Sequence, residues 1–128
     1  MKKLSIAFVW HLHQPNYQTQ HDEVMLMPWT RLNAVKTYSG MLKYLEKYPN
    51  LKLNFDISPV LLDALEGYAN GTLSDIHQNL TLTPVEELTP DDMEFILNYF
   101  FDLDYNNVIS KYPRYIDLYQ RRFSKEEI

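Results

Sequence analysis

Apolar runs and helical periodicity alternate along the first half of the chain. Residues 4–10 form a nearly continuous run of strand-forming apolar residues, which is typical of a strand covered on both faces in a parallel sheet. Residues 51–57 alternate between apolar and polar side chains, and this alternation also predicts a strand. Between them, residues 30–48 repeat apolar side chains at spacings of three and four, which predicts a helix.

A second helix is predicted directly after the second strand. Ser58 suits the N-cap position, Pro59 suits the first helical position, and Gly71 provides a C-terminal stop. The order of strand, helix, strand, helix implies that the two strands pair in parallel, because a helical crossover returns the chain to the same end of the sheet. The sequence therefore predicts an α/β fold.

The second half of the chain, residues 72–128, carries no strand signal and is predicted to be mainly helical. Thr89 and Pro90, followed by two acidic residues, predict the start of a helix. Further helices are predicted after Asp104 and over about residues 113–122. We interpret this region as a helical insertion that follows the second strand within the same domain.

The last residues contain a pattern that normally begins a helix. Ser124-Lys125-Glu126-Glu127 matches a capping box, and the sequence stops one residue later. Two parallel strands alone also leave sheet edges and faces uncovered. We therefore expect residues 1–128 to be the truncated N-terminal part of a single domain, with the remainder on the C-terminal side.

Charge and composition narrow the functional classes. The chain has 12 Lys and Arg residues against 17 Asp and Glu residues, a net charge of −5, which argues against binding to nucleic-acid phosphates. No apolar run approaches the roughly 20 residues that span a membrane. Because the chain has no cysteine, disulfides and thiolate metal sites are excluded and a reducing compartment is permitted. We predict a cytoplasmic protein that binds neither nucleic acid nor membrane.

Candidate functional residues gather where the two predicted strands end. His11 and His13 lie two positions apart, so an extended backbone points both side chains to the same side. Asp56 ends the second strand, where it can contact a substrate, hold a histidine in one tautomer, or serve a loop or helix-cap role beside Ser58. Barrel enzymes place their active sites at such strand ends, whereas the structural alternative is a pair of hydrogen-bonded histidines that fix a loop.

Amide and aromatic side chains near this strand end suit a sugar ligand. Gln14, restrained by Pro15, offers an amide for paired hydrogen bonds, and Tyr17 adds an aromatic ring. Trp29 offers a second stacking face. For Trp10, packing in the core is the favoured interpretation.

A His-x-His pair is also typical of metal-dependent hydrolases. Zinc needs at least three protein ligands, and the remaining histidines are His21, in a polar loop, and His77, in a predicted turn region. Nothing in the sequence places either beside the pair, so we predict no metal and no cofactor. No two carboxylates present themselves as nucleophile and acid, so we predict no catalytic residue within the chain.

The strand-end motif resembles that of a known enzyme family. His11-Leu12-His13-Gln14-Pro15-Asn16-Tyr17 is similar to the first signature region of glycoside hydrolase family 57. Further stretches agree with that family in order and spacing, and together they cover nearly the whole chain: Pro28-Trp29-Thr30-Arg31-Leu32-Asn33-Ala34-Val35-Lys36, Phe55-Asp56-Ile57-Ser58-Pro59-Val60-Leu61-Leu62, Leu80-Thr81-Leu82-Thr83-Pro84-Val85-Glu86-Glu87-Leu88 and Tyr112-Pro113-Arg114-Tyr115.

This resemblance implies the N-terminal portion of an incomplete (β/α)7 barrel. The resemblance also implies the activity of that family, whose members act on α-glucans or maltooligosaccharides with retention of configuration, as hydrolases, branching enzymes or glucanotransferases. By resemblance, His11 and His13 contact the sugar nearest the scissile bond, with Gln14 and Trp29 nearby. Asp56 is expected at the mouth of the barrel as well, because it ends the second strand. Retention needs two carboxylic acids, which in the family lie downstream of the matched region, so the chain alone is expected to be inactive.

Two positions depart from the family pattern, and two other hypotheses stay open. Asn33 stands where His is common and Asp56 where Asn is common, so Asp56 brings a negative charge near the mouth. The alternatives to an α-glucan enzyme are a metal-dependent His-x-His hydrolase barrel and a non-catalytic module for carbohydrate binding or interaction. Metal analysis and titration with maltooligosaccharides distinguish these hypotheses.

Overall fold

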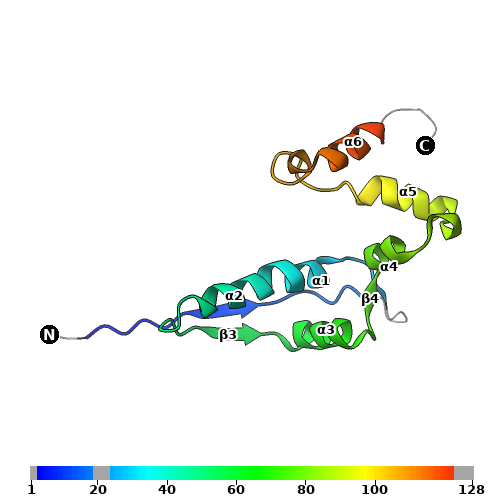
Figure 1. The fold of residues 1–128 in the computed structure, drawn as a ribbon. Coiled ribbons are helices and arrows are strands. Elements are labelled where there is room, and N and C mark those ends of the chain that lie inside the picture. The colour runs from blue at the N-terminus through cyan, green and yellow to red at the C-terminus, as the bar shows by residue number, and fades with distance from the viewer. Residues whose placement is uncertain (1–2, 19–23, 123–128) are drawn as a thin grey trace. The chain divides into compact units, whose positions relative to one another are not determined.

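The structure, a computed structural model, describes residues 3–18 and 24–122 (Figure 1). It divides into two compact units, Met1–Asn79 and Leu80–Ile128. His21 and the predicted capping box of residues 124–127 lie outside the described residues.

Two parallel strands bring the predicted strand ends together in the first unit. β1 (Val9–Leu12) pairs with β3 (Asn54–Ile57), which confirms the parallel pairing expected from the element order. In this register His11 lies opposite Asp56. The alternation of side chains along both strands then points these two residues to the same face of the sheet.

The first strand is shorter than predicted and less covered. It begins at Val9 and not at Leu4, because β3 provides hydrogen-bonding partners over only four residues. Leu4 is 86% exposed and Ile6 is 70% exposed, so the prediction that residues 4–10 are covered on both faces is wrong for this chain by itself. Trp10 is also 49% exposed, which contradicts its interpretation as a core residue.

The predicted helix over residues 30–48 is observed as three consecutive helical segments. α1 (Trp29–Asn33) continues into a π-helical segment η1 (Ala34–Tyr38) and then into α2 (Ser39–Glu46). The hydroxyl of Ser39 donates to the carbonyl of Val35 at 2.7 Å, and such side-chain bonds to the preceding turn accompany local changes in helix geometry. A π segment of this kind is rare and is often found near functional sites.

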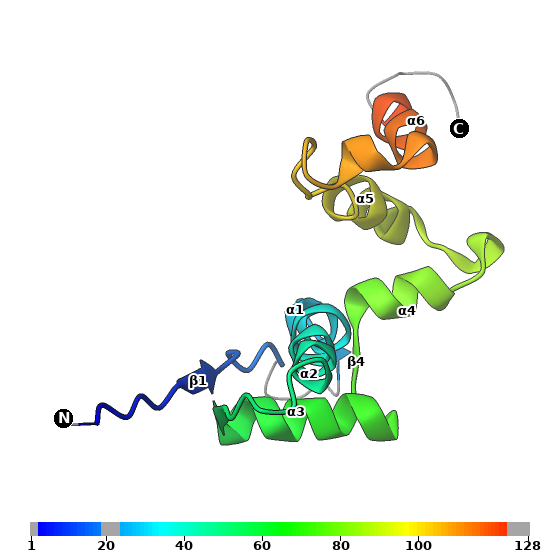
Figure 2. The same ribbon diagram turned by 60° about the vertical axis from the view of Figure 1, so that its left-hand side comes forward.

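α3 (Pro59–Asn70) follows the local signals in the sequence closely. The side chain of Ser58 caps the helix by accepting the N–H of Leu61 at 3.4 Å, and Pro59 occupies the first turn. Gly71 ends the helix with φ +75°, a left-handed conformation that glycine adopts without the Cβ clash of other residues. α1 packs against α3 (Figure 2), and the buried Leu61 belongs to this part of the first unit.

A second small sheet lies in the first unit. β2 (Val24–Met25) pairs in parallel with β4 (Ser74–Asp75), and Met25 and Asp75 are both fully buried. The prediction that no strand follows residue 72 is therefore wrong. A strand of two residues is too short to produce a visible alternation, and α4 (Ile76–Leu82) begins directly after it.

The described residues of the second unit are mainly helical. Its elements are η2 (Val85–Glu87), α5 (Pro90–Tyr99), η3 (Ile109–Lys111) and α6 (Pro113–Arg121). Thr89 and Asp92 form a reciprocal capping box at the start of α5, which confirms the helix start predicted there. Ile109 is fully buried, and the guanidinium of Arg122 stacks over Phe101 and Tyr119.

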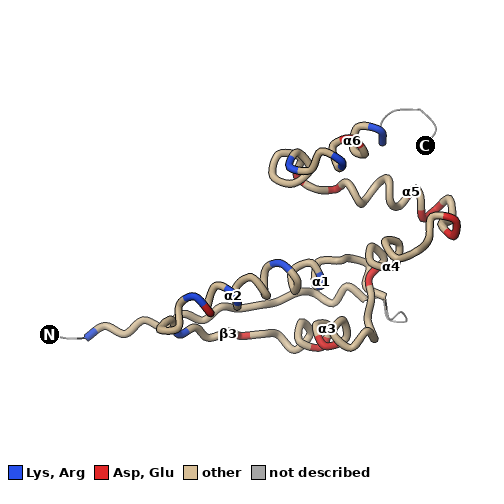
Figure 3. Tube along the Cα trace, viewed as in Figure 1, with Lys and Arg blue, Asp and Glu red and all other residues tan. Residues whose placement is uncertain are grey.

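Taken together, the described residues form a mixed α/β structure with two small parallel sheets and no closed barrel. None of the helices in residues 3–18 and 24–122 combines the length and the hydrophobicity needed to cross a bilayer. Charges of both signs are spread along the chain (Figure 3), with basic residues on α2 and α6 and the acidic Asp63 and Glu66 on α3.

Candidate functional site

The two histidines at the end of β1 face the residues that end β3 and begin α3. Nδ1 of His11 lies 2.7 Å from Oδ2 of Asp56, and Nδ1 of His13 lies 3.0 Å from Oγ of Ser58. The imidazole rings stack with their centroids 6.1 Å apart and an angle of 10° between their planes. Both contacts follow from the parallel register, because residues 11 and 13 run alongside residues 56 and 58.

The two histidines and Asp56 are open to solvent in this structure. The side chains of His11 and Asp56 are 63% and 64% exposed, and His13 is exposed as well. A contact between two side chains at this exposure contributes little to stability, since water competes for its hydrogen bond. The arrangement is therefore better suited to presenting polar atoms at the surface than to holding the fold together.

Gln14 connects the loop after β1 to the helix that follows it. Its Oε1 accepts the hydroxyl of Tyr17 at 3.0 Å, and its Nε2 donates to the hydroxyl of Tyr38 at 3.4 Å. These two contacts hold the amide between two hydroxyl groups, each of which can donate or accept a hydrogen bond. One amide hydrogen and one oxygen lone pair remain for a ligand.

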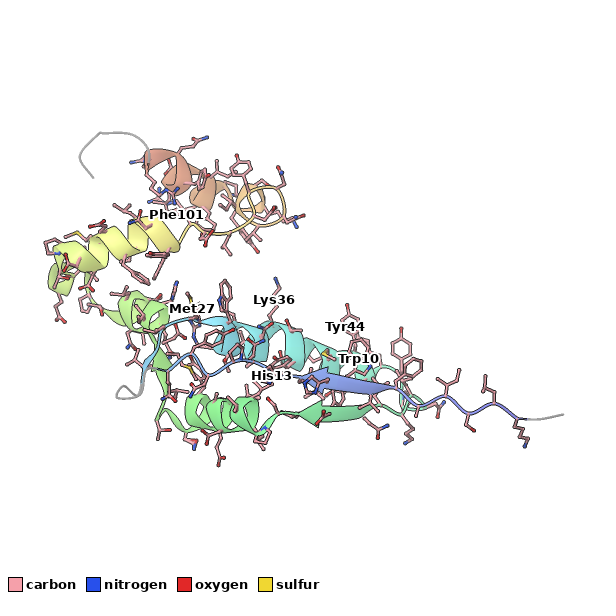
Figure 4. All side chains as sticks on the ribbon, turned by 180° about the vertical axis from the view of Figure 1, so that it is seen from behind. Trp10, His13, Met27, Lys36, Tyr44 and Phe101 are labelled. Atoms are coloured by element: carbon pink, nitrogen blue, oxygen red, sulfur yellow. The ribbon has the colours of Figure 1, made fainter. Side chains whose placement is uncertain are left out.

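The two tryptophans occupy different parts of the first unit. Trp29 begins α1 and is 42% exposed, and its carbonyl accepts the side-chain amide of Asn33 at 2.9 Å. Trp10 lies on β1 one residue before His11, and Figure 4 shows its side chain and that of His13 along this strand and the residues just after it. Within the described residues, no ring contact joins Trp29 to the histidine pair.

A buried carboxylate in the first unit was not anticipated from the sequence. Asp75 is fully buried and accepts two hydrogen bonds from Arg31, at 2.5 Å from Nε and 3.1 Å from Nη2. It also accepts the hydroxyl of Tyr68 at 3.2 Å and the N–H of Gln78 at 2.8 Å. The last contact is an N-cap interaction at the start of α4, and an acid before a helical segment was the one local signal available.

The electrostatics of this cluster indicate a fixed ion pair. Burial acts to raise the pKa of Asp75, but the hydrogen bonds from Arg31, Gln78 and Tyr68 outweigh it, and the net pKa is lowered. The hydrogen bond to Asp75 raises the pKa of Arg31, and burial together with the nearby carboxylate raises the pKa of Tyr68. Asp75 therefore stays ionised and Tyr68 stays protonated, so neither is poised to exchange a proton near neutral pH.

The ion pair between Arg31 and Asp75 includes a residue close in sequence to Trp29, one of the candidate site residues. Arg31 lies two residues after Trp29 in α1, while Tyr68 lies on α3 and Asp75 on β4. One carboxylate thus ties together three elements of the first unit and holds the start of α1 in place. The motif that contains Trp29 and Arg31 accordingly combines an exposed aromatic ring with a buried structural contact.

No group of three or more His, Asp or Glu side chains in residues 3–18 and 24–122 is arranged to hold a metal ion. His77, predicted to lie in a turn, belongs instead to α4, and burial lowers its pKa. The turn prediction failed because the short helix depends on the buried cap at Asp75. His21 lies outside the described residues, so the metal-dependent alternative stays a hypothesis.

Comparison with protein families shows that nearly the whole chain is similar to a known family. Residues 7–127 match the family described as glycosyl hydrolase family 57. Neither the curated proteins nor the solved structures gave a significant match. The matched range includes both histidines, the π-helical segment and the whole described part of the second unit.

Proposed function

We propose that this chain, which belongs to glycosyl hydrolase family 57, holds the sugar beside the scissile bond in an α-glucan-active glycoside hydrolase or glucanotransferase. Membership of this family implies a carbohydrate-active enzyme with α-glucan substrates. The proposed sugar-binding residues are His11, His13, Gln14, Trp29 and Asp56.

The observation that carries this proposal is the stacked histidine pair at the C-terminal ends of two parallel strands. Sugars are bound through hydroxyl groups, each of which donates one hydrogen bond and accepts others. The Nε2 atoms of both rings remain available, because Asp56 and Ser58 engage the Nδ1 atoms. Gln14 follows in the chain with an amide held between the hydroxyls of Tyr17 and Tyr38, and this placement favours a polar ligand at the strand ends.

For the fold, we propose an incomplete (β/α)7 barrel within one catalytic domain. Its first strand and helix are β1 and the helical segments α1, η1 and α2, and its second strand and helix are β3 and α3. The parallel register and the polar strand ends support this proposal. The exposed apolar side chains of β1 support it as well, because a neighbouring strand and helix in a barrel cover such positions.

Retaining cleavage of a glycosidic bond requires a nucleophilic carboxylate and a second carboxylic acid about 5 Å away. We propose that neither belongs to these 128 residues. Asp56 is paired with His11, and Asp75 is buried in its ion pair with Arg31. We therefore expect the purified chain to bind maltooligosaccharides weakly and to show no hydrolysis or transfer.

The test is a titration of the isotope-labelled chain with maltohexaose, followed by NMR shifts of the imidazole and Trp29 side-chain signals. His11→Ala and His13→Ala are expected to weaken binding, whereas Asp63→Ala, at an exposed position on α3, is the matched control and should leave it unchanged. Cellohexaose, the β-linked isomer, serves as the ligand control. Equal shifts with both sugars, stoichiometric bound zinc, or glucan turnover by the chain would each contradict the proposal.

A further inference from the structure

The two histidines are held by chemically different partners. His11 contacts a carboxylate at 2.7 Å, and His13 contacts a hydroxyl at 3.0 Å, in both cases through Nδ1. A neutral imidazole carries one hydrogen, so the partner at Nδ1 decides whether Nε2 is a donor or an acceptor. Two rings in nearly the same orientation can therefore present different chemistry to one ligand.

For His11 the partner leaves a single choice. An ionised carboxylate has lone pairs and no hydrogen, so it only accepts hydrogen bonds. The short contact between Nδ1 and Oδ2 of Asp56 then places the imidazole hydrogen on Nδ1. Nε2 of the neutral ring is consequently a hydrogen-bond acceptor.

For His13 the choice depends on the second role of Ser58. Oγ of Ser58 already accepts the N–H of Leu61 as the N-cap of α3, at 3.4 Å. The oxygen keeps a second lone pair, but within residues 3–18 and 24–122 the hydroxyl hydrogen has no acceptor other than Nδ1 of His13, 3.0 Å away, so we assign the donor role in this contact to Ser58. Nδ1 then accepts, the imidazole hydrogen lies on Nε2, and His13 is a donor toward a ligand.

We propose that Asp56 and Ser58 hold His11 and His13 in opposite tautomers, so that the stacked pair presents one acceptor and one donor to adjacent hydroxyl groups of a sugar. Asp56 and Ser58 are thus positioning residues. That the ligand is a sugar rests on the proposed function, whereas the tautomers are a property of the chain alone. An Asn in place of Asp56 would offer both an acceptor and a donor and would not impose one tautomer.

The wild-type chain without sugar provides the first test. Long-range ¹H–¹⁵N correlation spectra recorded at about pH 8.5, where an ordinary imidazole is neutral, distinguish protonated from unprotonated ring nitrogens. The single variants His11→Gln and His13→Gln assign the signals. We expect His11 to be protonated at Nδ1 and His13 at Nε2. The same tautomer in both rings, or averaged signals in either, would overturn the proposal without reference to any other variant.

Two substitutions then test the partners. Asp56→Asn should convert the single tautomer of His11 into a mixture, because the amide both donates and accepts. Ser58→Asp keeps a good N-cap but can only accept, so it should move the hydrogen of His13 from Nε2 to Nδ1. Asp63→Asn, at an exposed position on α3, is the matched control and should change neither ring. Unchanged tautomers in the first two variants would show that Asp56 and Ser58 do not set them.

The outcome is separable from that of the glucan proposal. Opposite tautomers in a chain that fails to bind maltohexaose would leave this inference standing and remove the proposed function. Glucan binding with identical tautomers in both histidines would do the reverse.

Discussion

Replacement of Asp75 with alanine tests whether the buried ion pair organises the first unit. Asp75 is fully buried and accepts four hydrogen bonds, two of them from Arg31. The substitution removes every acceptor at once. The guanidinium of Arg31, the hydroxyl of Tyr68 and the N–H of Gln78 then lose their acceptor and must bind water or find new partners through local movement.

The expected loss in the free energy of unfolding depends on which of these groups can bind water again. Removal of one partner from a buried charge pair costs about 3–5 kcal/mol. The side chain of Arg31 is 27% exposed, so part of its charge can be rehydrated, which favours the lower end of that range. The neutral bonds from Tyr68 and Gln78 contribute about 1 kcal/mol each, and they overlap with the charge term because they share one carboxylate. We expect a loss of about 3–4 kcal/mol in the free energy of unfolding.

The measurement is urea unfolding of the chain, followed by far-ultraviolet circular dichroism. Asp63→Ala, which removes an exposed carboxylate from α3, is the control and should change stability by less than about 0.5 kcal/mol. Tyr68→Phe removes a single hydrogen bond and should cost about 1 kcal/mol, so it remains measurable if Asp75→Ala is fully unfolded. A loss below about 1 kcal/mol for Asp75→Ala, or purely additive effects of Arg31→Ala and Asp75→Ala, would refute the reasoning.

The remaining predictions concern pH, two glycines and one helix cap. Folding lowers the pKa of Asp75, so the ionised carboxylate stabilises the folded chain above the ordinary pKa of 3.8, and this stabilisation is lost as the pH falls through the pKa of the folded state. In acid unfolding, the free energy of unfolding should therefore fall less below pH 4 in Asp75→Asn than in the wild type. Gly67→Ala places a Cβ 2.9 Å from that of Leu73 and should destabilise the chain by about 1 kcal/mol in urea unfolding, whereas Gly40→Ala, with open space around it, should stabilise α2 by up to about 1 kcal/mol. Equal effects of the two glycine substitutions would contradict this. Thr89→Ala should cost about 1 kcal/mol and speed amide exchange in the first turn of α5, and unchanged exchange there would show that the capping box is not needed.

Features that depend on a few neighbouring residues could be predicted from the amino-acid sequence alone. Ser58 and Gly71 mark the ends of α3, and Thr89 marks the start of α5, because capping involves backbone groups within one helical turn. The parallel pairing of β1 and β3 was predictable as well, since the order of elements limits how two strands with a helical crossover can pair. The side-by-side placement of His11 and His13 follows from alternation along an extended backbone.

Contacts between residues that are distant in the sequence could not be predicted and became visible only in the folded chain. The contact between His11 and Asp56 depends on the register of strands that lie 45 residues apart in sequence, and a shift by one residue would have turned Asp56 to the other face. The burial of Asp75 likewise depends on Arg31, 44 residues away, and no local pattern encodes that partner. Capping and periodicity depend on residues within a few positions of one another. Strand register and the pairing of a buried charge depend on the free energy of the whole packed unit.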